Sequence, residues 1–329
     1  MDLSIGERTV LNQLQGGFPV TERPFEALQS RLGMETEKLV DVIRDLEEKN
    51  YLSRFGLVLN PSRMGGSSRL AAMEVPSHDL EETIRTVNES STVTHNYLRN
   101  HDINVWFVLS AEKPETIDES IEQLESTTGY EIYSLPKLRE YYVGLRFYFE
   151  EDGTVRTVNV EDGYGEPSAG ESPTDNEFHR RLILETQTGL PVRIQPYRSI
   201  ADSLAVQTGA VVEGLRELKS AGVIKRIGCV PNHYGLGIEG NGMCVFDVPD
   251  EDVDAVGSKL GDRPEVTHCY KRPRYRPEWP YNLFAMVHDR TRSKAIQKVD
   301  QLRRELDLKE YPYRVLFSER KCKKTGLQL

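Results

Sequence analysis

The tetrapeptide Gly17-Phe18-Pro19-Val20 returns 172 residues later as Gly189-Leu190-Pro191-Val192. The same offset relates Arg54-Phe55-Gly56 to Arg226-Ile227-Gly228. An offset of 173 relates Thr94-His95-Asn96-Tyr97 to Thr267-His268-Cys269-Tyr270. A repeat of this length has the size of a domain pair and is too long for the unit of a solenoid. The sequence therefore predicts two tethered copies of one design, in which a site in one copy need not match the site in the other.

The composition is that of a globular chain with an acidic balance. Its 329 residues are enough for several domains, and the formal net charge is −10, which disfavours nucleic acid as the main partner. We see no apolar run near the length of a membrane span and no signal-peptide pattern at the start. The four cysteines all lie in the second copy without a C-x-x-C pair, which disfavours an iron–sulfur or zinc site and indicates a reducing cytoplasm.

The apolar periodicity predicts an α+β fold with a helical part and a mixed part in each copy. Apolar residues within 39–46 follow the helical i, i+3, i+4, i+7 spacing, and 51–59 is interpreted as a short hairpin or wing. A β-α-β-β-α-β pattern typical of ferredoxin-like domains follows, with its last strand in the first copy expected over 131–148. The predicted domains are winged helix-turn-helix 1–62, ferredoxin-like 63–150, linker 151–174, winged helix-turn-helix 175–234 and ferredoxin-like 235–329.

A winged helix followed by a ferredoxin-like domain is the layout of Lrp/AsnC transcription regulators, but the would-be recognition helix is acidic. Residues 34–50 hold six acids and three bases, namely Glu35, Glu37, Asp41, Asp45, Glu47 and Glu48 against Lys38, Arg44 and Lys49. DNA phosphates repel a surface with this balance. We therefore expect no specific DNA binding, and a helical front end that packs the two halves together.

The strongest functional signal is one strand in each copy. Side chains alternate between the faces of a strand, so His95, Tyr97 and Arg99 share one face. In the second copy the corresponding face carries His268, Tyr270 and Arg272, whereas His101 has no histidine counterpart there. An imidazole that exchanges protons near neutral pH, an amphipathic ring and a cation would line one surface.

A basic hairpin in an acidic chain is the second signal. Lys271, Arg272, Arg274 and Arg276 lie close together around Tyr275, and Arg139 lies in another basic stretch. Arginine forks bind carboxylates bidentately, which favours a flat ligand with many carboxylates. The plainer readings stay open: a strand histidine that is only hydrogen-bonded, a Trp106 that belongs to the core, and a hairpin that is a solvated loop.

At these residues the chain resembles the siroheme decarboxylases, AsnC/Lrp-like enzymes of heme d1 and alternative heme biosynthesis. The resemblance covers essentially the whole chain outside the linker. In the family two related subunits are separate chains or one fused chain, and this chain is similar to the fused type. The motifs that carry the resemblance are Thr94 to Phe107, Thr267 to Arg274, Trp279 to Phe284, the ending Leu135-Pro136 to Gly144, and the repeated Gly-(Phe/Leu)-Pro-Val front.

The resemblance implies that carbon dioxide is lost from the C12 and C18 acetate side chains of siroheme, which gives 12,18-didecarboxysiroheme. No cofactor is expected beyond the iron that siroheme carries, and the expected partners are siroheme and further copies or related decarboxylase subunits. A tetrapyrrole-responsive Lrp/AsnC-type transcription regulator and a non-catalytic heme-binding protein are the alternatives. With the residue chemistry above, the expected catalytic residues are His95, His268, His101 and Tyr97, and the expected substrate-binding residues are Arg99, Trp106, Arg139, Tyr270, Arg272, Arg274 and Arg276.

Overall fold

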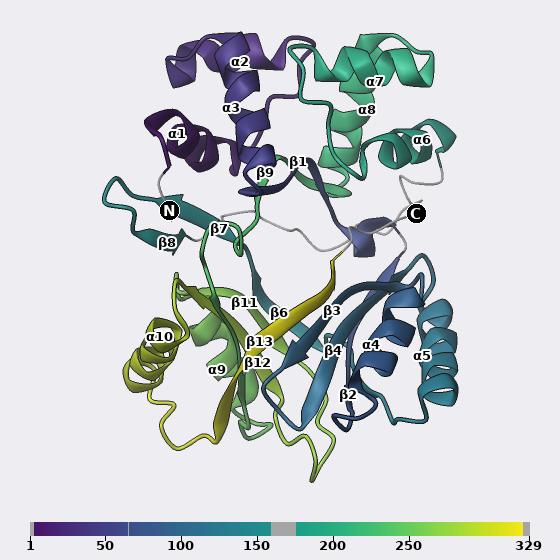
Figure 1. Cartoon of the computed structure of the whole chain (residues 1–329), viewed down its shortest axis with the longest axis vertical. Helices are drawn as coiled ribbons and strands as arrows, with labels where there is room; N and C mark the ends of the chain where they lie inside the picture. The colour runs from purple at the N-terminus through teal and green to yellow at the C-terminus, as the bar shows by residue number, and fades with distance from the viewer. Residues whose placement is uncertain (1–2, 65, 159–175, 325–329) are drawn as a thin grey trace.

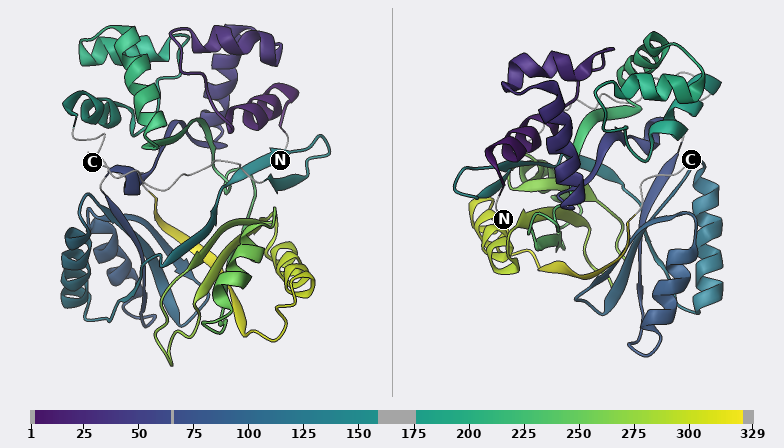
Figure 2. Two further views of the ribbon diagram at one scale, coloured as in Figure 1. Left: turned by 180° about the vertical axis from the view of Figure 1, so that it is seen from behind. Right: turned by 45° about the horizontal axis from the view of Figure 1, so that its top comes forward.

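The protein has two layers, a pair of helical domains and a curled β-sheet (Figure 1). The structure is a computed structural model that describes residues 3–64, 66–158 and 176–324. The two copies lie side by side in both layers, as the view from behind also shows (Figure 2). No helix within the described ranges is long and apolar enough to cross a membrane.

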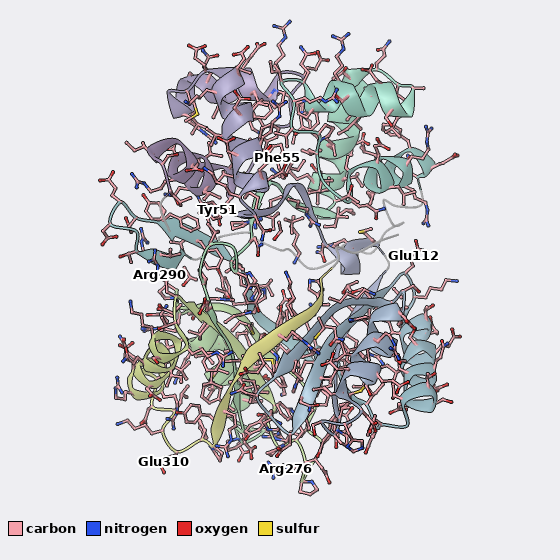
Figure 3. All side chains as sticks on the ribbon, in the orientation of Figure 1. Tyr51, Phe55, Glu112, Arg276, Arg290 and Glu310 are labelled. Carbon is pink, nitrogen blue, oxygen red and sulfur yellow. The ribbon has the colours of Figure 1, made fainter. Side chains whose placement is uncertain are left out.

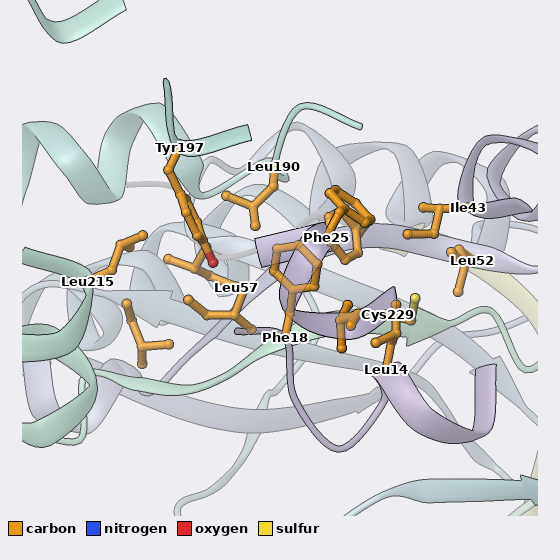
Figure 4. Packing of buried hydrophobic residues seen from close by; sticks show 14 of the residues in the cluster. Leu14, Phe18, Phe25, Ile43, Leu52, Leu57, Leu190, Tyr197, Leu215 and Cys229 are labelled. Atoms are coloured by element: carbon orange, nitrogen blue, oxygen red, sulfur yellow. The ribbon is translucent and has the colours of Figure 1, made fainter. Parts of the chain in front are cut away.

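The helical layer is one continuous core shared by both copies. Phe18 packs within this core near Phe25, Leu57 and Tyr197 (Figure 4). Its ring meets Phe25 and Phe55 edge-on, with ring centroids 5.0 and 4.8 Å away. The Tyr197 hydroxyl of the second copy donates to the Pro19 carbonyl of the first at 2.9 Å. This shared core confirms that the helical front end packs the halves together. Its helices are α1 (Ile5–Leu14), α2 (Pro24–Leu32), α3 (Thr36–Glu48), α6 (Glu177–Thr186), α7 (Pro196–Leu204) and α8 (Thr208–Ser220).

The predicted wing is a single strand that pairs with its own repeat. Strand β1 (Leu52–Leu59) runs antiparallel to β9 (Ile224–Pro231), and Gly56 lies opposite its counterpart Gly228. A Cβ atom on Gly56 would come within 2.7 Å of the Gly189 Cα atom. The short hairpin expected over 51–59 is therefore wrong, because this segment is one strand whose partner comes from the other copy. A pseudo-twofold axis passes through the Gly56–Gly228 pair.

The second layer is a nine-stranded antiparallel sheet in the order β5-β2-β4-β3-β13-β10-β12-β11-β6. Helices cover its outer face and the inner face is concave (Figures 1 and 2). The strands are β2 (Ser67–Glu74), β3 (Val93–Arg99), β4 (Ile103–Ala111), β5 (Tyr133–Leu135), β6 (Arg139–Val143), β10 (Gly240–Phe246), β11 (Val266–Lys271), β12 (Leu283–Asp289) and β13 (Tyr313–Lys324). The covering helices are α4 (Leu80–Glu89), α5 (Pro114–Thr128), α9 (Val253–Gly261) and α10 (Arg292–Glu305), and a 3-10 turn, η1 (Pro61–Met64), precedes β2.

The last strand of each copy crosses to the other copy. Strand β13 pairs with β10 of its own copy through 313–317 and with β3 of the first copy through 318–324. In the first copy the corresponding segment is split, so β5 pairs with β2 and β6 pairs with β11 of the second copy. The continuous strand expected over 131–148 is therefore wrong. Pro136, which has no N–H group for a ladder, follows directly after β5.

A β-hairpin after the crossing strand ties the two layers together. It consists of β7 (Arg146–Phe149) and β8 (Val155–Val158), so residues 155–158 of the expected linker form a strand. The Asn12 and Gln15 amides of α1 each donate to and accept from the backbone of β7, at 2.8 to 3.0 Å. Residues 159–174 of the expected linker lie outside the described residues.

Candidate functional site

Two side-chain ladders face the concave side of the sheet. The first, called ladder one, consists of His95, Tyr97 and Arg99 on β3. The second, called ladder two, consists of His268, Tyr270 and Arg272 along β11. The residues between them point to the helices: Asn96 donates to Asn88 on α4 at 2.9 Å, and Cys269 contacts the Gly257 carbonyl of α9. The shared faces predicted from strand alternation are therefore present in both copies.

Ladder one is half-buried at its histidine end and buried at its arginine end. The rings of His95 and Tyr97 stack at 6.3 Å, and the Arg99 guanidinium lies 5.8 Å from the Tyr97 ring centroid. Burial raises the pKa of Tyr97 to about 12, and it lowers the pKa of Arg99 to about 10. Tyr97 is therefore a neutral hydrogen-bond donor and Arg99 a cation at neutral pH.

Ladder two repeats this geometry in a more enclosed setting. The His268 and Tyr270 rings are 6.1 Å apart, and the Arg272 guanidinium lies 5.0 Å from the Tyr270 centroid. Burial, aided by the positive charge of Lys225 on β9, lowers the pKa of His268 to about 4. Burial also raises the pKa of Tyr270 and lowers that of Arg272 to about 10. His268 therefore lies at the end of the sheet that approaches β9 and the helical layer.

The two ladder arginines join the halves reciprocally. Arg99 donates to the Leu316 carbonyl of β13 at 2.9 Å, and Arg272 donates to the Leu135 carbonyl of β5. Each guanidinium thus contacts the last strand of the other copy. Part of their hydrogen-bonding capacity is used within the protein, so the simple carboxylate fork expected for them is not their whole role.

The strands opposite the two ladders differ in charge. Lys321 of β13 is the register partner of Tyr97, whereas Glu140 of β6 is the partner of Tyr270. Lys137 lies 5.5 Å over the Tyr270 ring and pairs with Glu140 at 2.9 Å. The two faces are therefore chemically distinct, as a fused pair of copies allows.

Trp106 belongs to the apolar cluster that fills the interior between the halves. It is 1% exposed, its indole N–H donates to the Ile103 carbonyl at 2.8 Å, and it packs against Trp279 at 5.0 Å. His101 meets the same Trp279 edge-on at 5.4 Å and accepts from the Ile103 N–H. Burial lowers the pKa of His101. It follows β3 at the end away from His95, so the structure does not bring these two histidines together.

The basic hairpin lies at the end of the molecule formed by the sheet layer, away from the β1–β9 ribbon (Figure 3). Figure 3 shows Arg276 there, away from Tyr51 and Phe55 of the ribbon region. Arg276 pairs with Asp247 at 2.9 Å, and Arg274 is neutralised by Asp247 and Asp250. These contacts argue against the expected carboxylate clamp at Arg274 and Arg276.

Arg139 also lies away from the ladders. It pairs with Asp254 of α9 at 3.0 Å, on the helix-covered face. Strand β6 is irregular between Glu140 and Tyr142, where its register against β11 shifts. Arg139 is therefore on the outer face, whereas Glu140 lies opposite Tyr270.

A further buried histidine, to which no sequence pattern points, lies beside ladder two. His288 on β12 is 5% exposed, and its Nε2 atom lies 2.9 Å from the Thr267 hydroxyl. The same hydroxyl lies 3.0 Å from Nδ1 of His268. His288 is far from these residues in sequence and has no histidine counterpart in the first copy, so only the strand register connects it to the site.

Comparison with known families divides the chain as the fold does. Residues 63–142 and 235–323 match the family model described as the AsnC-like ligand binding domain. Residues 7–52 and 179–225 match the model described as the siroheme decarboxylase NirDL-like HTH domain. Both copies therefore contain both kinds of domain.

Individual relatives cover either the whole chain or half of it. The siroheme decarboxylase NirDL subunit of Paracoccus denitrificans is 31% identical over 96% of this chain and 95% of its own length. The siroheme decarboxylase NirH subunit of Pseudomonas aeruginosa is 45% identical over 49% of this chain and 95% of its own length. A crystal structure of the siroheme decarboxylase NirDL in complex with an iron-uroporphyrin III analogue superposes with a TM-score of 0.69, at 26% identity, over 98% of this chain and 94% of that one.

Proposed function

This chain belongs to the siroheme decarboxylases of the fused NirDL type, and we propose that it removes carbon dioxide from the C12 and C18 acetate side chains of siroheme at the concave ladder face. Siroheme decarboxylation is the reaction of the family, in heme biosynthesis. The observation that carries the proposed site is the repeated His-x-Tyr-x-Arg face, present in both copies with lysines beside it. The proposed product is 12,18-didecarboxysiroheme.

The chemistry needs a proton donor. Direct loss of carbon dioxide from an acetate group would leave an unstabilised carbanion. Protonation of the adjacent ring carbon turns the pyrrole into an electron sink, so the carbon–carboxylate bond can break and leave an exocyclic methylene. The methylene then takes up a proton and the ring carbon loses one, which gives a methyl group. Each acetate group that becomes a methyl group therefore releases one carbon dioxide and consumes one proton, and the proposed reaction requires no cofactor.

We assign the proton-donating role to the ladder histidines. Imidazole is the side chain best suited to donate and regain a proton near neutral pH. The neutral phenols of Tyr97 and Tyr270 can donate hydrogen bonds to the substrate, while Lys137 and Lys321 supply positive charge for its carboxylates. A bound anion raises the pKa of a nearby imidazole, so siroheme itself would raise the low pKa of His268.

The arginines orient the ladder and extend its positive charge. Arg99 and Arg272 are held by the backbone of the other copy and lie against the tyrosine rings. Fixed cations select which acetate comes close to the acid, because a misplacement of about 1 Å can slow a reaction about 100-fold. The proposed site leaves out five residues that the sequence had suggested, namely His101, Trp106, Arg139, Arg274 and Arg276.

The decisive experiment is to incubate the purified protein with siroheme under anaerobic conditions and to measure the mass of the product. Loss of two molecules of carbon dioxide is the expected result. Unchanged siroheme that binds tightly would favour the non-catalytic carrier, and a siroheme-dependent footprint on DNA would favour the regulator.

The proposal also covers the assembly of the protein and its location. Relatives that cover half of this chain are named as subunits, so we propose that the protein also associates with further copies or with related subunits. We propose a cytoplasmic location, which the free thiols of Cys229, Cys244, Cys269 and Cys322 support.

A further inference from the structure

We propose that His288 and Thr267 form a proton relay that delivers protons from solvent to His268, which makes the second copy the half that protonates the substrate. The inference rests on the proposed role of His268. The relay specifies where protons enter the protein, which side chains carry them, and which half protonates the substrate. Membership of the family implies none of these.

The path is a chain of two short hydrogen bonds. Nε2 of His288 lies 2.9 Å from Oγ1 of Thr267, and that atom lies 3.0 Å from Nδ1 of His268. A hydroxyl accepts one hydrogen bond while it donates another. His288 can therefore donate to Thr267, and Thr267 can donate to His268. The Met286 carbonyl is a competing acceptor for the hydroxyl, at a longer 3.3 Å.

His288 is also among the residues that line a small pocket. A space of about 10 Å³, enough for about one water molecule, is lined by residues that include His288, Phe147, Thr157 and Arg290. Nδ1 of His288 is buried and has no hydrogen-bond partner among the described residues. We assign a water in this cavity as the partner of Nδ1. The β7–β8 hairpin supplies one wall, and Arg290 marks this side of the molecule in Figure 3.

The proton count along this path balances. Nδ1 of His288 takes a proton from the water, and its Nε2 proton passes to Thr267 Oγ1. The threonine hydroxyl proton passes to Nδ1 of His268, whose Nε2 proton goes to the substrate. One proton enters and one leaves, and the direction of each hydrogen bond is reversed. This is the one proton that each decarboxylation consumes.

A relay is needed because the substrate would cover His268. Siroheme against ladder two would separate this imidazole from bulk water on the concave side. Burial lowers the pKa of both His268 and His288, so both are neutral at rest and pass a proton on readily. The titratable groups nearest His288 are His233, at a ring distance of 6.1 Å, His268, and Lys298, which donates to the His288 carbonyl at 2.8 Å. The pocket that His288 lines adds the charged side chains of Arg156, Asp289 and Arg290.

The first copy lacks the second imidazole. Thr94 contacts Nδ1 of His95 at 3.1 Å, as Thr267 contacts His268. The register pairs His95 with Val108 and His268 with Met286, so the counterpart of His288 is Ser110. Ser110 donates to Ser68 at 3.3 Å. The relay is therefore a property of the second copy, whereas the Thr-His pair is common to both.

Three substitutions test the relay with siroheme as substrate. His288→Gln keeps a donor toward Thr267 but cannot pass a proton through, and Thr267→Val removes the hydroxyl at constant shape. His288→Ala opens space for added imidazole. We expect kcat to fall about 10- to 100-fold in each, within the range for a lost proton-transfer group, with KM changed less than about twofold. Imidazole should restore kcat in His288→Ala, and Ser110→Ala should match the parent.

The outcomes separate the relay from the site. If His288→Gln turns over at the parent rate, or imidazole leaves His288→Ala slow, the relay is wrong. If His268→Ala is impaired while all His288 and Thr267 variants are normal, the relay fails but the proposed site stands. If His268→Ala turns over at the parent rate, His268 is not the proton donor, and the relay to it is wrong as well. A reduced unfolding temperature without a change in kcat would show a structural role only and would also overturn the relay.

Discussion

The Arg99 guanidinium of the first copy donates to the Leu316 carbonyl of the second at 2.9 Å, and Arg272 makes the reciprocal bond to Leu135. Both arginines are 8% exposed, so these bonds lie within the protein. The two halves are thus joined at the point where each crossing strand leaves its own copy. Residues that the sequence assigned to substrate binding are also part of the assembly of the sheet.

Arg99→Gln is therefore expected to reduce the free energy of unfolding. The loss of a buried hydrogen bond from a charged donor costs about 1.5–3 kcal/mol. Urea denaturation followed by circular dichroism measures the shift of the midpoint. The matched control is Arg276→Gln, because Arg276 is 61% exposed and exposed ion pairs contribute about 0–1 kcal/mol. Equal midpoints for the two variants would refute the structural role of Arg99.

Replacement of the ladder histidines is expected to affect turnover more than binding. His95→Ala or His268→Ala should lower kcat by roughly 10²–10⁴-fold wherever that histidine is the general acid. Siroheme affinity, measured by titration of its absorbance, should change little. Ser110→Ala, which lies outside the proposed site, is the control. Normal turnover in both single histidine variants and in the double variant would rule out the histidine mechanism.

The ladders show what local sequence rules can predict. The alternation of His95, Tyr97 and Arg99 on one face depends only on strand geometry, and it is present. The repeat offset likewise identified the matching ladder in the second copy. Fold class and family were predicted for the same reason, since the motifs repeat over nearly the whole chain.

Long-range pairing explains what sequence analysis missed. Residues 51–59 were expected to form a short hairpin or wing, but they hold one strand, and its partner is the equivalent strand 172 residues away, centred on Gly56 and Gly228. The importance of His288 depends on its register against Thr267, which no sequence spacing reveals. The acids that neutralise Arg274 also come from another segment, around Asp247. Local rules do not describe any of these contacts.

The positive charge near the ladders should govern the salt dependence of siroheme binding. Lys137→Gln removes a cation beside Tyr270 and leaves Glu140 without its partner there, so siroheme should bind roughly tenfold more weakly at low salt. Its affinity should also fall less steeply with added salt, because one attractive charge is gone. Arg276→Gln makes the same charge change at a cation that Asp247 already pairs, outside the proposed site, and should leave both quantities unaltered. If Arg276→Gln behaves like Lys137→Gln, the basic hairpin does bind substrate.

DNA binding is expected to be weak and unspecific. The exposed residues of the would-be recognition helix region include Glu37, Asp41, Asp45 and Glu48, and Arg44 is engaged by Asp41 and the Val192 carbonyl. A helix in the major groove needs cations for the phosphates, and this one presents mostly acids. A footprinting assay at physiological salt, with and without siroheme, measures this. Protection of a defined operator would contradict the expectation.

The buried histidines should make stability depend on pH in a defined direction. The pKa of His268 is lowered to about 4 in the folded state, and an unfolded histidine titrates near 6.5. Below pH 6.5 the unfolded chain therefore binds a proton that the native protein does not. The free energy of unfolding falls as the pH is lowered from 6.5 toward 4, by up to about 3 kcal/mol from this residue. The stability is fully present above pH 6.5.

Unfolding midpoints measured between pH 4 and 8 test this directly. His268→Gln should flatten the curve over this range, because glutamine does not titrate, and His288→Gln should act in the same direction since burial also lowers the pKa of His288. His78→Gln is the matched control, because that side chain is 76% exposed. A parent curve that superposes on that of His268→Gln at every pH would show that the imidazole is not held neutral by burial. Bound siroheme should reduce the dependence, since its carboxylates favour the imidazolium form.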